Sequence, residues 1–236
     1  MKPDEIDRII EEAAGRFPAR EGDGSNVETI AGALLQDLRP VRPLAPAWVF
    51  TLSLTCLFAI FAVVSASILG LHGVHALSFT QIGWLFSGLL GTAMMAAVAS
   101  AREMRPASGV RLGFRVPVAA IAVFLALFAS LLTGYGTQHF VAEGIPCLVA
   151  GLSVALPTAA AAVWILRRGY VMDWSKAGTV AGTLAGLTGL GMLELHCPNL
   201  KAIHVMVWHV AVVMVSGAAG FAIGWLADSL RRKRMQ

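Results

Sequence analysis

The sequence predicts an all-α membrane protein: a bundle of six transmembrane helices that follows a short amphipathic helical region in the cytoplasm. Composition is the first reason, because 57% of the 236 residues are apolar and only 14% are charged, which is too apolar for an ordinary soluble domain. The second reason is length, since six apolar runs each approach the ~17–25 residues that a helix needs to cross a ~30 Å hydrocarbon layer. These runs are residues 47–71, 79–100, 116–133, 147–166, 177–193 and 202–227.

The distribution of basic residues predicts the orientation. Of the 18 Lys and Arg residues, only Lys201 falls in a connection that we place outside the membrane. The others cluster at the two termini and in every second connection, and cytoplasmic connections are the ones that carry excess Lys and Arg. We therefore expect a multi-pass protein of the bacterial inner (cytoplasmic) membrane with both termini inside. The basic residues face anionic lipid in this interpretation, so they do not indicate a direct nucleic-acid partner.

Three segments follow from this pattern: a cytoplasmic region of residues 1–46, a transmembrane domain of residues 47–230, and a basic cytoplasmic tail of residues 231–236. In the first segment, apolar residues recur at helical spacing over residues 6–17 and 27–38. Two helices of this size bury little core by themselves, so their apolar stripes need a partner. The residues that we expect to contact it are Ile30, Leu34, Leu35 and Leu38.

The polar residues of this N-terminal region are mainly acidic. Helices that lie on a membrane surface usually carry basic residues on their polar face. A protein partner with a basic or mixed surface therefore fits better than anionic lipid. Self-packing and simple disorder remain alternatives, because acidic polar segments are often only solvated.

The predicted outer face collects all six histidines and two of the three cysteines. Cys147 begins the fourth apolar run and Cys197 follows the fifth, so both lie at one level on one side. An oxidising compartment permits a disulfide between them, whereas two thiolates near histidines could instead hold a soft or borderline metal ion, at least transiently. The histidine candidates for such a site are His196, His204 and His209.

Two further expectations concern these side chains. His204 and His209 are five residues apart, which is not the i,i+4 spacing that aligns ligands on one α-helical face, so a metal site would need separate segments. Cys56 lies inside the first apolar run, where we expect a buried small hydrophobic residue.

Motifs and charges narrow the function classes. The sequence contains no Gly-x-Ser-x-Gly, P-loop or His-Glu-x-x-His motif, so we do not expect an enzyme. No charged residue lies near the middle of an apolar run, which argues against ion-coupled transport. A small-solute or metal transporter and a haem-binding membrane redox protein remain the alternative functions. Two G-x-x-x-G patterns, at Gly182/Gly186 and Gly220/Gly224, predict close helix packing.

Several segments together resemble the NrsF family of membrane anti-sigma factors, the negative regulators of sigma-F-type extracytoplasmic-function (ECF) sigma factors. They are the proline-rich approach at residues 39–46, Pro146-Cys147-Leu148, and Leu195-His196-Cys197-Pro198 followed by Val207-Trp208. The resemblance implies that the N-terminal region holds an ECF sigma factor away from RNA polymerase. It also implies that Cys147 and Cys197 sense envelope stress, such as an oxidant or a heavy metal. The chain differs from the family pattern in its longer N-terminal region and in His209 directly after Trp208.

Overall fold

The computed structural model describes residues 44–105 and 113–234, which belong to one compact unit that spans Leu44–Gln236. The secondary structure of these residues is entirely helical, which confirms the all-α class. Five helices are α3 (Ala47–Leu69), α4 (Phe79–Glu103), α5 (Arg115–Leu131), α6 (Phe140–Leu166) and α7 (Trp174–His196), with a short 3₁₀ turn, η1 (Val74–Ala76), between the first two. A last helical stretch combines α8 (Ala202–His204), the π-helical turn η2 (Val205–His209) and α9 (Val210–Arg234).

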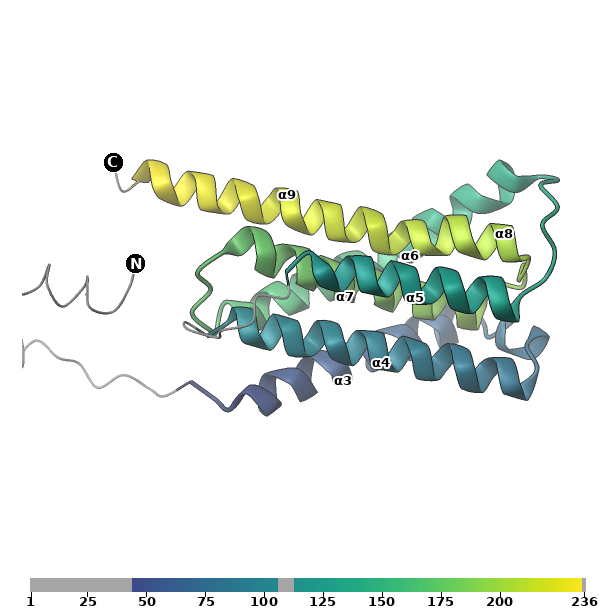
Figure 1. Cartoon of the computed structure of the whole chain (residues 1–236), viewed down its shortest axis with the longest axis horizontal. Coiled ribbons are helices and arrows are strands. Elements are labelled where there is room, and N and C mark those ends of the chain that lie inside the picture. Colours follow the sequence, from purple (N-terminus) through teal and green to yellow (C-terminus); the bar gives the residue numbers. More distant parts are fainter. Residues whose placement is uncertain (1–43, 106–112, 235–236) are drawn as a thin grey trace, which may run out of the picture. The chain divides into compact units, whose positions relative to one another are not determined.

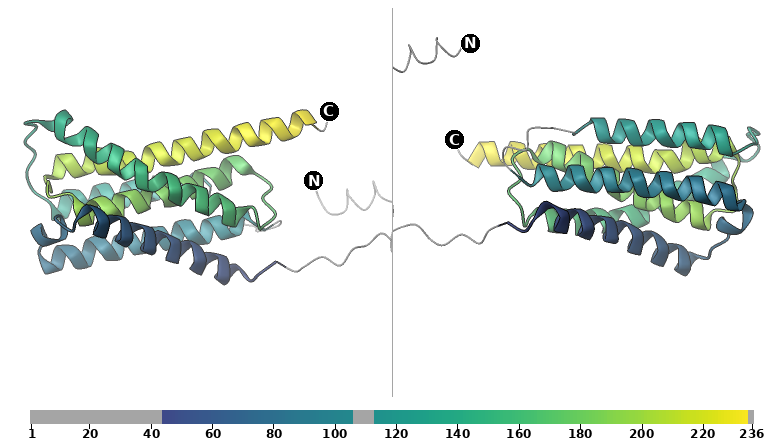
Figure 2. Two further views of the ribbon diagram at one scale, coloured as in Figure 1. Left: turned by 180° about the vertical axis from the view of Figure 1, so that it is seen from behind. Right: turned by 60° about the horizontal axis from the view of Figure 1, so that its bottom comes forward.

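Consecutive long helices run in opposite directions, so the connections collect at two ends of the bundle (Figures 1 and 2). The cysteine end contains the connections of residues 70–78, 132–139 and 197–201. The arginine end contains the end of α4, the start of α5, the connection of residues 167–173, the start of α3 and the end of α9. Among the described residues, Lys201 is the one Lys or Arg at the cysteine end.

Four of the helices are long and apolar enough to cross a membrane: Ala47–Leu69, Phe79–Glu103, Phe140–Leu166 and the stretch Ala202–Lys233. Helix α5 is apolar but shorter, at 17 residues. Helix α7 is the central helix, and every residue from Thr179 to Glu194 is buried. A helix that is covered by other helices can contain Gly and Thr in place of lipid-facing apolar residues. The number of six spans stays a prediction.

Helices α7 and α9 pack backbone against backbone. A Cβ atom added to Gly178 or Gly182 of α7 would lie under 3.0 Å from the carbonyl oxygen of Gly220 or Ser216 in α9, respectively. A Cβ atom on Gly220 would meet the carbonyl oxygen of Gly178 in the same way. This close approach confirms the packing role that the two G-x-x-x-G patterns predict.

Replacement of Gly220 by alanine should destabilise the bundle by at least about 1–3 kcal/mol, the usual cost of overpacking, because the obstacle is a backbone carbonyl that cannot rotate away. The matched control is Gly83→Ala in α4, where nothing lies within 4 Å of the added Cβ and the better helix propensity of alanine should stabilise the protein by up to about 1 kcal/mol. Thermal unfolding of the purified protein in detergent measures both. Equal melting temperatures for the two variants would contradict the packing described for α7 and α9.

Two expectations about the helices are wrong. Helix α3 buries Phe50, Leu54, Phe58, Ala62 and Ala66, one residue per turn. Cys56 lies on the opposite face and is exposed. The fourth long helix begins at Phe140 rather than at Cys147, because Pro146 is accommodated inside it, as membrane helices allow.

The predicted partner contacts Ile30, Leu34, Leu35 and Leu38 lie outside the described residues, as does the end of the basic tail at residues 235–236.

Candidate functional site: a Cys2His2 cluster at the cysteine end

Four side chains with metal-binding atoms meet at the cysteine end. Cys147 comes from α6, Cys197 follows α7, His204 ends α8 and His209 ends η2. One ligand atom from each residue lies within 4.8 Å of all the others. The two sulfur atoms are 3.5 Å apart, and the Cys197 Sγ lies 3.7 Å from the His204 Nε2. Both cysteines are free thiols; Cys147 is partly buried and the other three residues are fully buried.

The π-helical turn brings the two histidines together. An α-helix has about 3.6 residues per turn, so residues five apart do not share a face. In η2 the backbone N–H of Val210 donates to the carbonyl oxygen of Val205, five residues earlier, and this wider turn places the His204 and His209 rings 5.4 Å apart. One continuous segment therefore supplies both histidines, although their spacing does not align them on an α-helix, while the two cysteines come from separate segments, as expected for a site of this composition. Single π-helical turns occur frequently at functional sites.

Glu194, in the last turn of α7, fixes the orientation of His209. Its carboxylate Oε1 lies 2.7 Å from the His209 Nδ1, and its side chain is buried. Because a carboxylate accepts hydrogen bonds, Nδ1 carries a hydrogen, and in the neutral imidazole the lone pair is then on the second ring nitrogen, Nε2. Sequence reasoning did not select Glu194. The available signal was an acidic residue at the end of an apolar run, three residues before Cys197.

The neighbouring connections cover the cluster. The Asn199 Nδ2 donates to the Glu143 Oε2 at 2.6 Å, which ties the connection after α7 to the start of α6. The Gly73 N–H donates to the Leu195 carbonyl oxygen at 3.0 Å. A Cβ atom on Gly73 would lie under 3.0 Å from the Cys197 carbonyl oxygen, so only glycine allows this contact. These contacts join the connection after α3, the end of α7 with the connection that follows it, and the start of α6 next to the cluster.

Hydrogen bonding inside the cluster affects the Cys197 thiol. Its contact with the Cys147 sulfur, followed by burial, raises the pKa of Cys197 above the ordinary value, and the two histidines oppose this effect. The net result favours a neutral thiol. A cation that binds the sulfur must therefore displace a proton.

His196, a predicted metal ligand, is not part of the cluster. Its Nδ1 lies 2.9 Å from the Gly70 carbonyl oxygen, and its ring meets the ring of His72 edge-on at 5.8 Å. The last turn of α7 thus directs His196 toward the connection that follows α3, whereas Cys197 turns toward α6. His196 and His72 serve below as matched controls for the two cluster histidines.

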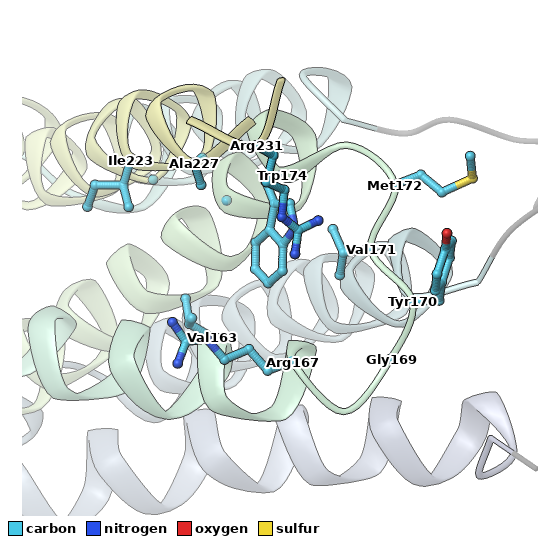
Figure 3. Close-up of a pocket in the computed structure, with 13 residues that line it drawn as sticks. Val163, Arg167, Gly169, Tyr170, Val171, Met172, Trp174, Ile223, Ala227 and Arg231 are labelled. Carbon is cyan, nitrogen blue, oxygen red and sulfur yellow. The ribbon is translucent and has the colours of Figure 1, made fainter. Parts of the chain in front are cut away.

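A separate cavity of about 880 Å³ lies at the arginine end, between the connection from α6 to α7 and α9 (Figure 3). Arg167, Trp174 and Arg231 are among its lining residues, and the Arg231 guanidinium carbon lies 5.2 Å from the centre of the Trp174 ring. The described residues that line this cavity include no Cys, His, Asp or Glu. Its cationic and apolar lining does not suit a cation or redox chemistry, so the cluster at the opposite end is the candidate site.

Comparisons with known proteins give one result. No curated protein and no solved structure matches the chain. The family model described as NrsF, negative regulator of sigma F, matches residues 34–227 and so includes both cluster cysteines and both cluster histidines. Because the match extends over most of the 236 residues, the chain belongs to the NrsF family of negative regulators of sigma F.

Proposed function

We propose that this family member is an anti-sigma factor of the bacterial inner membrane that holds an ECF sigma factor at the cytoplasmic face. In this proposal residues 1–46 bind the sigma factor, and Cys147 and Cys197 on the outer face trigger its release when an oxidant or a heavy metal reaches them. The main support is that the thiol pair and the described Lys and Arg residues other than Lys201 lie at opposite ends of a single helical bundle.

The charge distribution supports the orientation. The described Lys and Arg residues, apart from Lys201, belong to the arginine end, and the positive-inside rule assigns such an end to the cytoplasm. The start of α3 belongs to the same end (Figure 1). On this assignment the N-terminal region before α3 is on the cytoplasmic side, which is the compartment where sigma factors act. The partners in this account are the sigma factor and the lipid bilayer, without direct contact to nucleic acid.

The thiol pair supports an oxidant or a heavy metal as the signal. Two sulfur atoms 3.5 Å apart can form a disulfide when an oxidant accepts two electrons and the thiols release two protons. A soft metal ion would instead bind the thiolates. Either event changes the spacing between α6 and the connection after α7. Because residues 167–173 join α6 to α7 at the arginine end, a change at the cysteine end has a direct covalent path to the cytoplasmic side.

The alternative functions receive less support. Glu194 is the one Asp, Glu, Lys or Arg residue buried among the described residues, and it pairs with His209 near the end of the bundle. Ion-coupled transporters place such groups at the middle of the membrane. Haem with two axial histidines needs them on opposite faces of the macrocycle, whereas the His204 and His209 rings lie side by side at 5.4 Å.

Reporter fusions test the orientation. A reporter that is active only in the cytoplasm should be active when fused after Gln236 and inactive when fused after Gly136, which lies in a connection at the cysteine end. A reporter that is active only outside the cytoplasm should give the reverse result. Identical signals from the two positions with either reporter would contradict the proposed topology and, with it, outer-face sensing.

A further inference from the structure

We propose that Cys147, Cys197, His204 and His209 form a four-ligand site for a zinc-class cation, Zn²⁺ or Cd²⁺, and that Glu194 is its positioning residue. This proposal adds the ligands of the sensing site to the proposed function. It rests on the proposed function only for the role of the site in releasing a sigma factor. It goes beyond two sensing thiols, because it assigns the two histidines as ligands and the carboxylate as their support. The binding chemistry itself can be measured without any sigma factor.

The spacing of the ligand atoms fits a tetrahedral ion. Zinc–sulfur bonds of about 2.3 Å and zinc–nitrogen bonds of about 2.0–2.1 Å place tetrahedral ligand atoms roughly 3.3–3.8 Å from one another. The two measured contacts, sulfur to sulfur and Cys197 Sγ to His204 Nε2, are 3.5 Å and 3.7 Å. All four ligand atoms already lie within 4.8 Å of one another. A central ion therefore requires only small adjustments in the positions of the four ligands, not a rearrangement of the bundle.

Unpaired polar atoms gather at this point of the fold. The buried side-chain nitrogens and oxygens without a hydrogen-bond partner, among the described residues, include His209 Nε2, His204 Nδ1 and Glu194 Oε2. Each buried atom of this kind costs about 1–3 kcal/mol when it stays unpaired, and such atoms in a native structure call for an explanation such as a bound ion. Of these three atoms a bound cation would pair the His209 Nε2, whereas His204 would bind through its Nε2, which already faces the Cys197 sulfur.

Glu194 supplies the support that metal-binding histidines usually have. A histidine ligand almost always donates its other ring N–H to a carboxylate, a carbonyl or water, which fixes its tautomer and makes it a better ligand. The 2.7 Å contact between His209 Nδ1 and Glu194 Oε1 provides this arrangement. The Glu194 residue is 1% exposed, so the negative charge of its carboxylate also favours a cation in surroundings that contain little water.

The donor set selects the class of ion. Two thiolates and two imidazoles in a closed tetrahedral arrangement are typical of zinc and its heavier, softer relatives, whereas magnesium and calcium require oxygen ligands. Two thiolate charges also balance the charge of a divalent ion. A bound cation would join α6, the connection after α7, and the α8–η2 segment, so three parts of the bundle would be tied together at the cysteine end.

Titration of the purified full chain with Co²⁺ tests the site. The reduced, metal-free protein in detergent should bind one Co²⁺ per chain and develop the visible bands of a tetrahedral ion together with thiolate charge-transfer absorption. Zn²⁺ and Cd²⁺ should each displace it. Cys147→Ser should remove much of the charge-transfer absorption, and His209→Ala should lose the tetrahedral bands. Glu194→Gln should keep these bands but weaken binding about 10–100-fold, the usual effect of losing such a supporting contact.

The controls are His196→Ala and His72→Ala, which remove histidines at the same end but outside the cluster and should leave the titration unchanged. The site is wrong if wild-type protein shows no saturable Co²⁺ spectrum, or if His209→Ala binds as wild type does. It is also wrong if the two control variants lose binding as strongly as the cluster variants. Because these measurements need no sigma factor, a negative result leaves oxidant sensing by the thiols intact, and failure to find a sigma factor leaves the metal site intact.

Discussion

Substitution of both Leu34 and Leu35 by aspartate should weaken binding of the sigma factor at least about 100-fold. The two leucines belong to the predicted apolar stripe of residues 27–38. A buried leucine contributes about 1.5–3 kcal/mol, and ~1.4 kcal/mol corresponds to a factor of ten in affinity. A buried, unpaired carboxylate adds a further cost. Co-purification of the sigma factor with the tagged full chain measures the effect.

The matched control is the double variant Ala33→Asp, Gln36→Asp, which adds the same charge to the same segment but off the predicted stripe. It should retain the sigma factor. If the leucine variant also retains the sigma factor, the assigned contact surface is wrong. If both double variants lose it equally, the added negative charge, not the apolar stripe, accounts for the loss.

Replacement of either Cys147 or Cys197 by serine should abolish the transcriptional response to oxidants and heavy metals while the sigma factor stays bound. Serine preserves the size of the side chain but can neither form a disulfide nor offer a thiolate ligand. Since the two sulfur atoms are adjacent, loss of one should be as severe as loss of both. Transcription from a sigma-dependent promoter, with and without stress, reports the response.

Cys56→Ser is the matched control for this experiment. Cys56 is a free thiol on the exposed face of α3, so its loss should leave the response unchanged. A normal response in both the Cys147→Ser and the Cys197→Ser variants would show that the thiol pair is not the sensor. A lost response in the Cys56→Ser variant would contradict the assignment of sensing to the cysteine end.

Much of the fold follows from apolar periodicity. The predicted start at residue 47 and the predicted start at residue 79 agree with α3 and α4, and α5 begins one residue before the predicted run. Such boundaries are predictable because a membrane-spanning helix needs one continuous apolar stretch of a certain length, and this stretch can be read directly from the sequence. The start of α6 was less predictable, since a proline at residue 146 usually marks the beginning of a helix but here lies inside one.

The geometry of the candidate site could be predicted only in part. Charge and span count predict that Cys147 and Cys197 lie at the same end of the bundle, but their adjacency depends on how α6 packs against α7. No sequence rule predicts the π-helical turn at Val205–His209, so the alignment of the two histidines could not be predicted. The pairing of Glu194 with His209 is likewise a tertiary contact between residues 15 positions apart. The local sequence around either residue does not predict it.

The most direct test of the central claim is the amount of sigma factor that remains bound to the full chain in isolated membranes before and after treatment with a thiol-specific oxidant. We expect wild-type membranes to hold the sigma factor and to lose it on oxidation, whereas membranes with the Cys147→Ser, Cys197→Ser double variant should hold it throughout. Retention by oxidised wild-type membranes, or equal loss from both kinds of membrane, would contradict control of the sigma factor by this thiol pair.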